Sequence, residues 1–392
     1  MFRSEDPLTS RRCDARPIYV EFPDFGFGPA AAALALINGL DDPYDWHLVS
    51  SGSAAAYARA HLPQAAHHEL NTFDRASWER FCGLASSGSL TLSITNPDFA
   101  AWAAEQGYAV GIIDTLDWMW PSLPAGVDRA RFHLMQAFFG ETAKAGGSRS
   151  SAEVVQPIVD PSLWGISGRG RQPQPGTVVI GFGGMHLPLP FGDELVADYT
   201  RWFLGTALPL LVYHPGISKV SIVGGRTDLP DLVPRAWSGH PAVEIRPRLP
   251  QPLYSALLHS ATYLLLSPGL GSLYECAASG LAPLLQPGWN MSMLLQAYHV
   301  ALTGYEHLCP WPWLEEAVGD ISDQAEHDGL VYLARRLQQT IQEDLHSPES
   351  MLVKPILRYL ELGDASTPLH LPVSEALPTA TERLTHHLRS LF

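Results

Sequence analysis

Short apolar runs alternate with helical stretches along most of the chain. Each run is apolar on both faces, as a strand needs to be when helices cover both sides of its sheet. Repeated strand–helix–strand order of this kind predicts α/β units with parallel strands. In the first half, the predicted strands are 18–22, 46–51, 89–95 and 109–114, and the first predicted helix is 28–40.

The alternation breaks once and then starts again. Residues 167–176, SGRGRQPQPG, are rich in Gly, Pro, Arg and Gln and have no apolar periodicity, which is typical of a linker. Beyond it, a helix is predicted over 192–212 and another from about 272. The strands predicted in this half are 177–184, 219–225, 242–247, 262–267 and 282–287.

A chain of 392 residues with two such series is expected to form two domains. The predicted fold class is α/β, with two Rossmann-like domains that face each other across a cleft where ligands bind. The last segment is helical, and we expect it to pack back on the first domain. The predicted segments are a flexible leader at 1–16, domains at 17–166 and 177–340, the linker at 167–176 and C-terminal helices at 341–392.

Composition removes several classes of function. The net charge of −15 argues against a nucleic-acid partner, because phosphate backbones are bound by basic patches. No run of about 18 apolar residues predicts a membrane span. Residues 1–16 lack the apolar core of a signal peptide, so we expect a cytoplasmic protein.

Metal and cofactor sites are not indicated by the sequence. The four cysteines share no metal spacing, and the adjacent pairs His67-His68 and His386-His387 lack a carboxylate partner. No D-x-D motif is present, and none of the three lysines follows a glycine as in a phosphate-binding P-loop. We therefore expect neither a metal nor a resident cofactor.

The first strand is followed by the loop EFPDFGFGPAAAALAL. Its Gly26, Gly28 and Ala31 satisfy G-x-G-x-x-A, so a dinucleotide site must be considered. The second strand ends without the acid that would hold an adenosine ribose, which disfavours NAD or FAD. Asp24 is the titratable group of this loop and our first candidate for a catalytic base; the alternative is a turn or cap residue.

A second group of candidates follows the strand at 109–114. Asp114 and Asp117 stand among Trp118 and Trp120 in GIIDTLDWMWPSLP. A carboxylate beside aromatic rings suits an acceptor pocket, in which the rings cover a flat face and the carboxylate takes a proton. Asp114 is the second candidate base. The alternative is a helix cap with core tryptophans.

The segment SPGLGSLYECAASG follows an apolar strand and opens a helix. Gly269 and Gly271 allow the backbone to approach a ligand, and the free N–H groups of the helix start can bind a diphosphate. Ser272 and Glu275 have S-x-x-E spacing, which fits a capping box. The alternative is that Glu275 accepts hydrogen bonds from the two hydroxyls of a ribose. Spacing alone leaves both interpretations open.

This segment, continued by LAPLLQPGWNMS, resembles the donor site of nucleotide-sugar glycosyltransferases with two Rossmann-like domains, the GT-B type. The resemblance runs from about 177 to 305, about a third of the chain. It implies that Glu275 binds the ribose of a UDP-sugar in the second domain, and that the acceptor binds in the first. The implied donor contacts are Gly269, Gly271, Ser272, Asn290, Ser292 and Gln296, and the loop positions add Gly183, Gly184, His186 and Arg226 as candidates. The alternative for His186 is a loop histidine without function, and for Arg226 a surface arginine. The acceptor candidates are Gly26, Gly28, Asp117, Trp118 and Trp120.

The match departs from the family pattern in three places. An extra residue stands between Gly280 and Pro283, and NMSMLLQ replaces the usual acidic residue before Gln296. The first-domain loop has no histidine, where members of the family often carry a catalytic one. Within the family, IIDTLDWMWPSLP and FHLMQAFFG look most similar to the cytosylglucuronate synthase group, which joins a sugar acid to cytosine in nucleoside antibiotic pathways.

The function implied is metal-independent transfer of a sugar from a UDP-sugar co-substrate to a small acceptor, by a monomer or homodimer. Asp24 or Asp114 would deprotonate the acceptor, while the helix after Ser272 and the Gly183-Gly184 loop stabilise the leaving diphosphate. The alternatives are a UDP-sugar hydrolase or epimerase of the same fold, a non-catalytic nucleotide-sugar-binding subunit, and a dinucleotide oxidoreductase.

Overall fold

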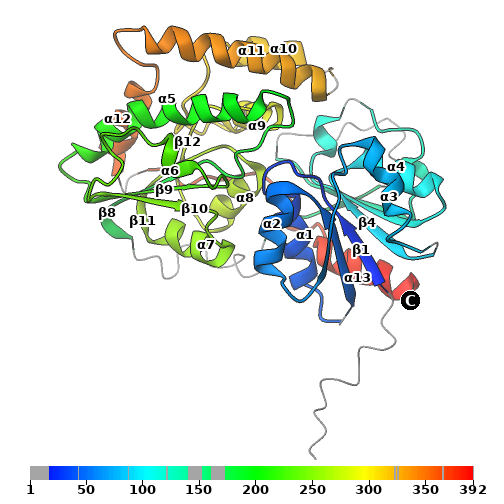
Figure 1. Ribbon diagram of the computed structural model, residues 1–392. Helices are drawn as coiled ribbons and strands as arrows, with labels where there is room; N and C mark the ends of the chain where they lie inside the picture. The colour runs from blue at the N-terminus through cyan, green and yellow to red at the C-terminus, as the bar shows by residue number, and fades with distance from the viewer. Residues whose placement is uncertain are drawn as a thin grey trace, which may run out of the picture.

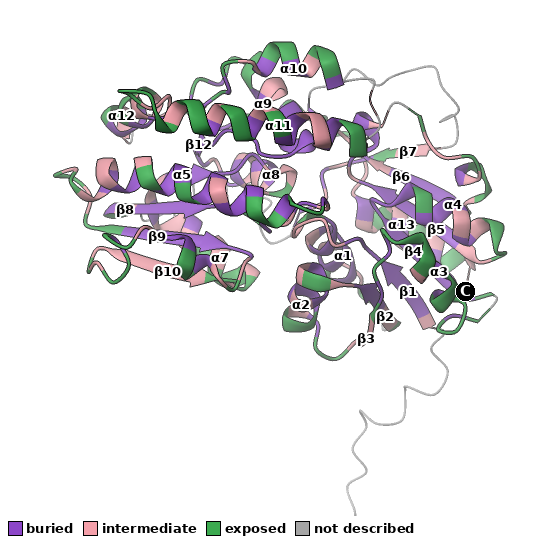
Figure 2. Ribbon diagram, turned by 45° about the horizontal axis from the view of Figure 1, so that its top comes forward, coloured by how far each residue is buried: buried purple, intermediate pink, exposed green. Residues whose placement is uncertain are grey.

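Two parallel sheets organise the chain in the computed structural model, one in each half (Figure 1). Most of the apolar runs form strands, and Figure 2 shows the central strands buried between helices whose outer faces are exposed, while the edge strand Val243–Pro247 is only partly buried. The structure describes residues 17–42, 44–86, 88–120, 122–139, 152–159, 173–321, 324, 326–363 and 366–391.

The first sheet has seven strands in the order β3-β2-β1-β4-β5-β6-β7, all parallel. The order reverses between β1 and β4, and the loops at such a switch point open a crevice for ligands. The strands are β1 (Pro17–Glu21), β2 (Asp45–Ser50), β3 (Ala66–Glu69), β4 (Leu90–Ile94), β5 (Ala109–Asp114), β6 (Phe132–Gln136) and β7 (Ala152–Val155).

Helices cover both faces of this sheet. One buried cluster joins it to α1 (Gly28–Asn38), α2 (Gly52–His61) and α13 (Ala380–Leu391). The other joins it to α3 (Arg75–Phe81) and α4 (Pro97–Glu105). Through α13, the last helix of the chain completes the core of the first half, and Figure 1 shows it beside the strands of that sheet.

The second sheet has five parallel strands in the order β10-β9-β8-β11-β12, and its switch point lies between β8 and β11. Figure 1 shows α5 on one side of it and α7 on the other. Its strands are β8 (Gln174–Gly181), β9 (Lys219–Gly224), β10 (Val243–Pro247), β11 (Ala261–Leu266) and β12 (Leu284–Leu285). Its helices are α5 (Gly192–Val212), α6 (Leu229–Leu232), α7 (Gln251–Ser260), α8 (Leu270–Ala278), α9 (Met291–Leu302), α10 (Leu314–Ile321), α11 (Glu326–Leu345) and α12 (Val353–Leu362).

The predicted α/β class with two Rossmann-like units is confirmed, and α5 has the predicted bounds. Gln174–Gly176, expected in the linker, instead open β8, while the leader and most of the linker lie outside the described residues. The apolar run 282–287 shrinks to β12, because the two prolines that flank it cannot donate to a ladder. Among the described helices, none is long and apolar enough to cross a bilayer.

In each sheet a buried polar side chain helps to tie strand ends together. The carboxylate of Glu21, at the end of β1, accepts hydrogen bonds from Ser93 Oγ at 2.7 Å and Asn96 Nδ2 at 2.8 Å. In the second sheet, Gln286 Nε2 donates to the carbonyl oxygen of Leu265, 2.8 Å away. Because buried polar groups are costly when unsatisfied, these contacts fix the geometry of the loops that follow.

Burial gives Glu21 a pH-dependent effect on stability. Desolvation raises the pKa of this carboxyl group from its ordinary 4.5 to about 7, despite the hydrogen bonds from Thr72, Ser93 and Asn96. Between these two values the folded protein keeps a proton that the unfolded chain releases, so the free energy of unfolding falls as the pH rises, by about 1 kcal/mol per unit. In Glu21→Gln this dependence should be absent. Urea unfolding of both proteins at pH 5, 6 and 7 checks it, and equal slopes would contradict it.

Candidate active site

A cleft of about 320 Å³ opens between the two halves of the molecule. Its walls come from the loops that follow β1, β2, β3 and β8, and these loops lie at the carboxyl ends of parallel strands. Ligands of open α/β sheets bind at this edge. The cleft is lined by Asp24, Ser51, Asn71, Phe73, Asp74, His186, Leu187, Pro188, Leu189 and Pro190.

Asp24 is anchored at the start of α2. Its Oδ1 accepts hydrogen bonds from Ser53 Oγ at 2.6 Å and from the backbone N–H of Ala54 at 3.1 Å. Gly52, with a φ of +54°, lies so close to Asp24 Oδ2 that any side chain there would collide with it. The other oxygen, Oδ2, remains on the side of the cleft, so Asp24 combines the predicted cap contact with a place in the wall.

His186 stands opposite, in the loop after β8. Its Nδ1 lies 3.1 Å from Asp193 Oδ1, in the first turn of α5, and its Nε2 lies 4.0 Å from Asp24 Oδ2. The side chain is 31% exposed and that of Asp24 is 15% exposed, so both are reachable from the cleft. The two halves of the molecule thus bring an imidazole and a carboxylate face to face.

The glycine loops of the two halves touch each other. A Cβ on Gly184 would lie 2.6 Å from the backbone carbon of Gly26, which is too close for any side chain. Gly26 was predicted to face an acceptor and Gly184 a donor; here each faces the other. Around Gly28 and Gly183, by contrast, a Cβ would meet no atom within 4 Å.

Glu275 lies where α2, α7 and α8 meet. Its Oε1 accepts a hydrogen bond from Gln251 Nε2 at 2.6 Å, and the backbone N–H of Gln251 donates to His61 Nε2 at 2.8 Å. Tyr57 Oη also donates to Gln251 Oε1, at 3.3 Å. Glu275 is half-buried and is held by Gln251, which in turn binds the opposite domain.

The capping-box interpretation of Ser272 and Glu275 is wrong. Helix α8 begins at Leu270 with Gly269 at its N-cap, so Ser272 already lies inside the first turn and caps nothing. The helix therefore begins at Leu270, about two residues before the predicted start at 272. A Cβ on Gly271 would meet no atom within 4 Å, and one on Gly269 would meet only the end of the Met293 side chain, at 3.8 Å.

Arg226, an implied phosphate contact, is already occupied. Its Nε and Nη2 donate to Asp228 at 2.8 and 2.6 Å, and its Nη1 donates to the backbone oxygen of Asp193 at 2.7 Å. This pairing lowers the pKa of Asp228 and raises that of Arg226. Arg226 supports the start of α5, so a phosphate would have to compete with Asp228 for it.

The implied donor contacts on α9 are buried. Asn290 caps this helix by accepting hydrogen bonds from the N–H of Met293 and the Oγ of Ser292. Gln296 is only 1% exposed. Both the cap and the amide are buried, so their role as contacts of a donor sugar stays a prediction.

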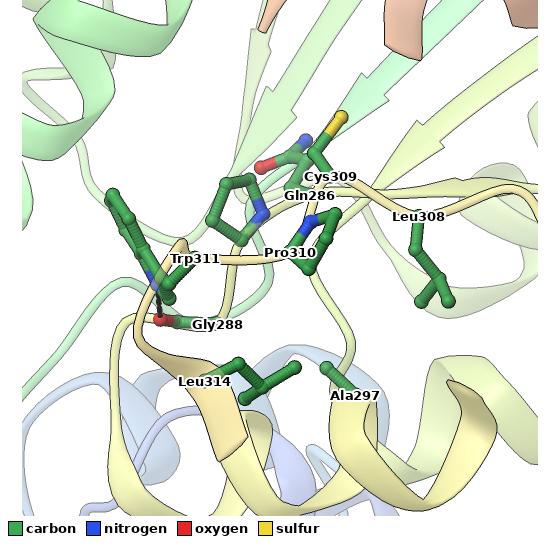
Figure 3. A pocket seen from close by; sticks show the side chains of 9 residues that line it. Gln286, Gly288, Ala297, Leu308, Cys309, Pro310, Trp311 and Leu314 are labelled. Atoms are coloured by element: carbon green, nitrogen blue, oxygen red, sulfur yellow. Dashed lines mark hydrogen bonds between the residues drawn. The ribbon is translucent and has the colours of Figure 1, made fainter. Parts of the chain in front are cut away.

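The loop that leads into α9 packs against the segment Cys309–Trp311. Figure 3 shows Gln286, Cys309, Pro310 and Trp311 around a cavity of about 10 Å³, in which Trp311 Nε1 donates to the carbonyl oxygen of Gly288 at 2.6 Å. A cavity of this size holds about one water molecule. It is too small for a substrate, so it is a packing defect next to the loop.

The residues after β5 have structural roles. Asp114 is fully buried, and its oxygens accept from the N–H of Leu116 at 2.8 Å and from Trp120 Nε1 at 2.9 Å. Trp118 stacks on Phe138 with ring centroids 3.7 Å apart, and both rings meet the edge of His299 on α9. This aromatic cluster joins the two halves where an acceptor pocket was predicted, so Asp114 and Trp118 fit the cap and core alternative.

One group of side chains has the composition of a metal site. Asp114, Asp117 and His133 each offer a ligand atom, and these atoms lie within 4.8 Å of one another. All three are buried, and Asp114 is held by the two hydrogen bonds just described. The expectation that the protein uses no metal stays a prediction.

Three residues of the site were not singled out by sequence reasoning. Asp193 holds His186, Gln251 holds Glu275, and His61 binds Gln251 across the domain boundary. Asp193 begins a predicted helix seven residues after His186, so its position at a strand–helix loop was an available signal. The contacts of Gln251 join segments 190 residues apart, which no local pattern reports.

Comparison with known proteins identifies the fold. The two sheets form the GT-B fold, as predicted. A structure described as a co-structure of S. aureus MnaA with UDP has a TM-score of 0.53 to this chain at 11% identity, over 96% of each chain. We found no protein-family model and no curated protein that matches the sequence.

Other solved structures align over similar lengths. A UDP-glucosyltransferase from Polygonum tinctorium covers 89% of this chain and 98% of its own, with 12% identity and a TM-score of 0.46. MurG from Acinetobacter baumannii covers 96% and 99%, with 12% identity and a TM-score of 0.45. We base the fold on the first structure alone.

Proposed function

We propose that the protein is a glycosyltransferase that moves a sugar from a UDP-sugar to a small acceptor. The observation that carries the proposal is the cleft, in which Asp24 from one domain and His186 from the other face a common space. A transfer between two substrates needs both held between groups that can take a proton and stabilise a leaving anion.

The donor nucleotide is placed against the second domain. The N-terminus of α8 follows the glycine loop at Gly269 and offers free N–H groups to a diphosphate. Glu275 lies in the next turn of α8. Its carboxylate would accept hydrogen bonds from two ribose hydroxyls, which either replace the amide of Gln251 or bind next to it. UDP is the ligand named for the S. aureus structure of the same fold, which supports this choice of nucleotide.

The acceptor is placed in the cleft itself. The apolar part of the wall is formed by Phe73, Leu187 and Pro188. Asn71 adds an amide to the lining, which also contains Asp24 and Asp74. A volume of about 320 Å³ suits a small planar molecule. We propose a cytosine-type base as the acceptor, with a glucuronate as the sugar in nucleoside natural-product biosynthesis. The walls support the first choice, and the second rests on sequence resemblance alone.

Calorimetric titration with UDP tests the nucleotide site. Selective micromolar binding is expected, with GDP, dTDP and NADPH as controls. Binding of NADPH alone would overturn the proposal in favour of an oxidoreductase, and no binding of any nucleotide would favour a degenerate subunit. Incubation with UDP-sugars but no acceptor then separates the alternatives, because a hydrolase releases free sugar and an epimerase returns an altered UDP-sugar.

A further inference from the structure

We propose that His186, oriented by Asp193, is the group that takes the proton from the acceptor. The inference rests on the proposed function and changes the role of His186 from a donor contact to the catalytic base. Asp24 then holds the acceptor and faces the charge that forms on the ring. Three segments of the chain bring these three side chains together.

The contact with Asp193 determines which ring nitrogen carries the hydrogen. An ionised carboxylate can only accept, so His186 Nδ1, at 3.1 Å from Asp193 Oδ1, must be the donor. In the neutral ring this leaves a lone pair on Nε2. The nitrogen that can accept a proton is therefore the one that lies nearest to Asp24.

The gap between His186 Nε2 and Asp24 Oδ2 fits one bridging atom. At 4.0 Å the two atoms are too far apart for a direct hydrogen bond. A nitrogen with two hydrogens placed beside the gap can lie about 2.8 Å from both atoms and donate to each, whereas a hydroxyl or a ring N–H has one hydrogen and donates to only one of them. Asp24 cannot drift toward the ring, because its Oδ1 is held by Ser53 and Ala54. An attacking amino nitrogen would thus donate to both groups, and an attacking hydroxyl or ring N–H would donate its one hydrogen to His186 Nε2.

The charged groups that lie beside the His186 ring are acidic. Two carboxylates lie beside it, Asp24 after β1 and Asp193 on α5, while Asp74, which lines the same cleft, uses its oxygens to cap α3. The guanidinium nearby, Arg226, is bound to Asp228. The positive charge that develops on the imidazole is therefore stabilised by acids on both sides, as a carboxylate stabilises an imidazolium in other hydrolytic and transfer sites.

In the proposed step, the acceptor's O–H or N–H atom forms a bond to the anomeric carbon of the sugar. The bond from that carbon to the diphosphate oxygen breaks, and its electron pair leaves with UDP. The acceptor's proton moves to His186 Nε2. Asp193 remains ionised and keeps its hydrogen bond to Nδ1–H.

The position of the base links chemistry to domain closure. His186 and Asp24 belong to different halves, and the contact of Gly184 with Gly26 marks how closely the two loops approach. If the two halves separate, His186 moves away from Asp24 and from an acceptor bound beside it. Proton transfer then requires the closed arrangement, in which bulk water is excluded from the sugar.

The tautomer of His186 can be measured without any substrate. In ¹⁵N-histidine-labelled protein, with the His186 signals identified by their loss in His186→Gln, the Nδ1-protonated form is expected. Asp193→Ala should shift His186 toward the Nε2-protonated form; Asp193 is 65% exposed, so the fold should tolerate this change. A wild-type ring that is protonated at Nε2 while neutral would overturn the proposal.

Turnover gives the second readout. UDP-glucose serves as donor, cytosine and 4-methylumbelliferone serve as acceptor probes, and UDP release is followed. His186→Gln should lose at least about a hundredfold in kcat while its calorimetric Kd for UDP is unchanged. Free imidazole should restore part of the rate in His186→Gly. His327→Gln, an exposed histidine on α11, is the matched control and should behave as the wild type.

The two tests separate the possible failures. Full activity of His186→Gln, or a loss of UDP affinity in place of kcat, would overturn the role of His186 and leave the glycosyltransferase proposal standing. A wild-type protein that binds no UDP would overturn the glycosyltransferase proposal and this inference with it. For a protein that binds UDP but transfers to neither probe, the tautomer measurement decides.

Discussion

Replacing Asp24 by asparagine is expected to reduce sugar transfer by about 10²- to 10³-fold, with no change in the affinity for UDP. Asparagine keeps an oxygen that can accept from Ser53 and Ala54, so the loop and the start of α2 should hold. It replaces Oδ2, however, with an NH₂ group that points toward His186 Nε2. That group would donate to the lone pair needed for the acceptor's proton.

The measurement is UDP release under saturating UDP-glucose, together with calorimetry on the same preparation. Asp198→Asn is the matched control, because Asp198 is an exposed acid on α5 that pairs with Arg201 away from the cleft. Full turnover by Asp24→Asn would show that Asp24 only caps α2. A parallel loss of UDP affinity would place its role in the nucleotide site.

Glu275→Gln is expected to weaken UDP binding by about 1.5–3 kcal/mol, which is a ten- to hundredfold rise in Kd. The ribose hydroxyls would donate to a neutral amide oxygen in place of a charged carboxylate, and hydrogen bonds to charged acceptors are the stronger ones. The substitution should not disturb the fold, because the new side chain can still accept from Gln251 Nε2.

Titrations of UDP and of uridine distinguish the role of Glu275 from a general effect. Both ligands carry the ribose, so both should lose affinity by a similar factor. Glu306→Gln, a surface acid of the same domain paired with Arg358, should bind UDP as the wild type does. An unchanged Kd in Glu275→Gln would assign this carboxylate to the contact with Gln251 alone.

Individual strands and helix starts could be predicted from the sequence where local residue patterns determine them. Strands such as β5 and β11 are apolar on both faces, and the glycines at the start of α8 stand out in the sequence, although the helix begins at Leu270 and includes Gly271. The element β3 was missed because its sequence, AHHE, has neither apolar alternation nor β-branched residues. It forms because β2 offers it a parallel partner, and a long-range partner leaves no mark on a four-residue segment.

The site was predicted only in part, for a physical reason. Asp24 and His186 were identified as candidates from loops at strand ends, but their approach depends on how two domains pack. The residues after β5 carried the right chemistry for a pocket, yet the aromatic contacts of Trp118 with Phe138 and His299 fill that space. The type of a residue and its position at a strand end predict a candidate site residue. Only the packing of the folded chain shows whether that residue is accessible to a ligand.

The return of α13 to the first sheet has a consequence for how the protein is made. Ala380, Leu384 and Leu388 fill the core between this helix and the strands of the first half. On the ribosome, the seven-stranded sheet and the helices α1 and α2 emerge about two hundred residues before α13, which completes the cover of the same face. The part of the apolar face that α13 buries stays uncovered until translation has passed residue 388, so the half that is synthesised first cannot complete its core before the other half has been made.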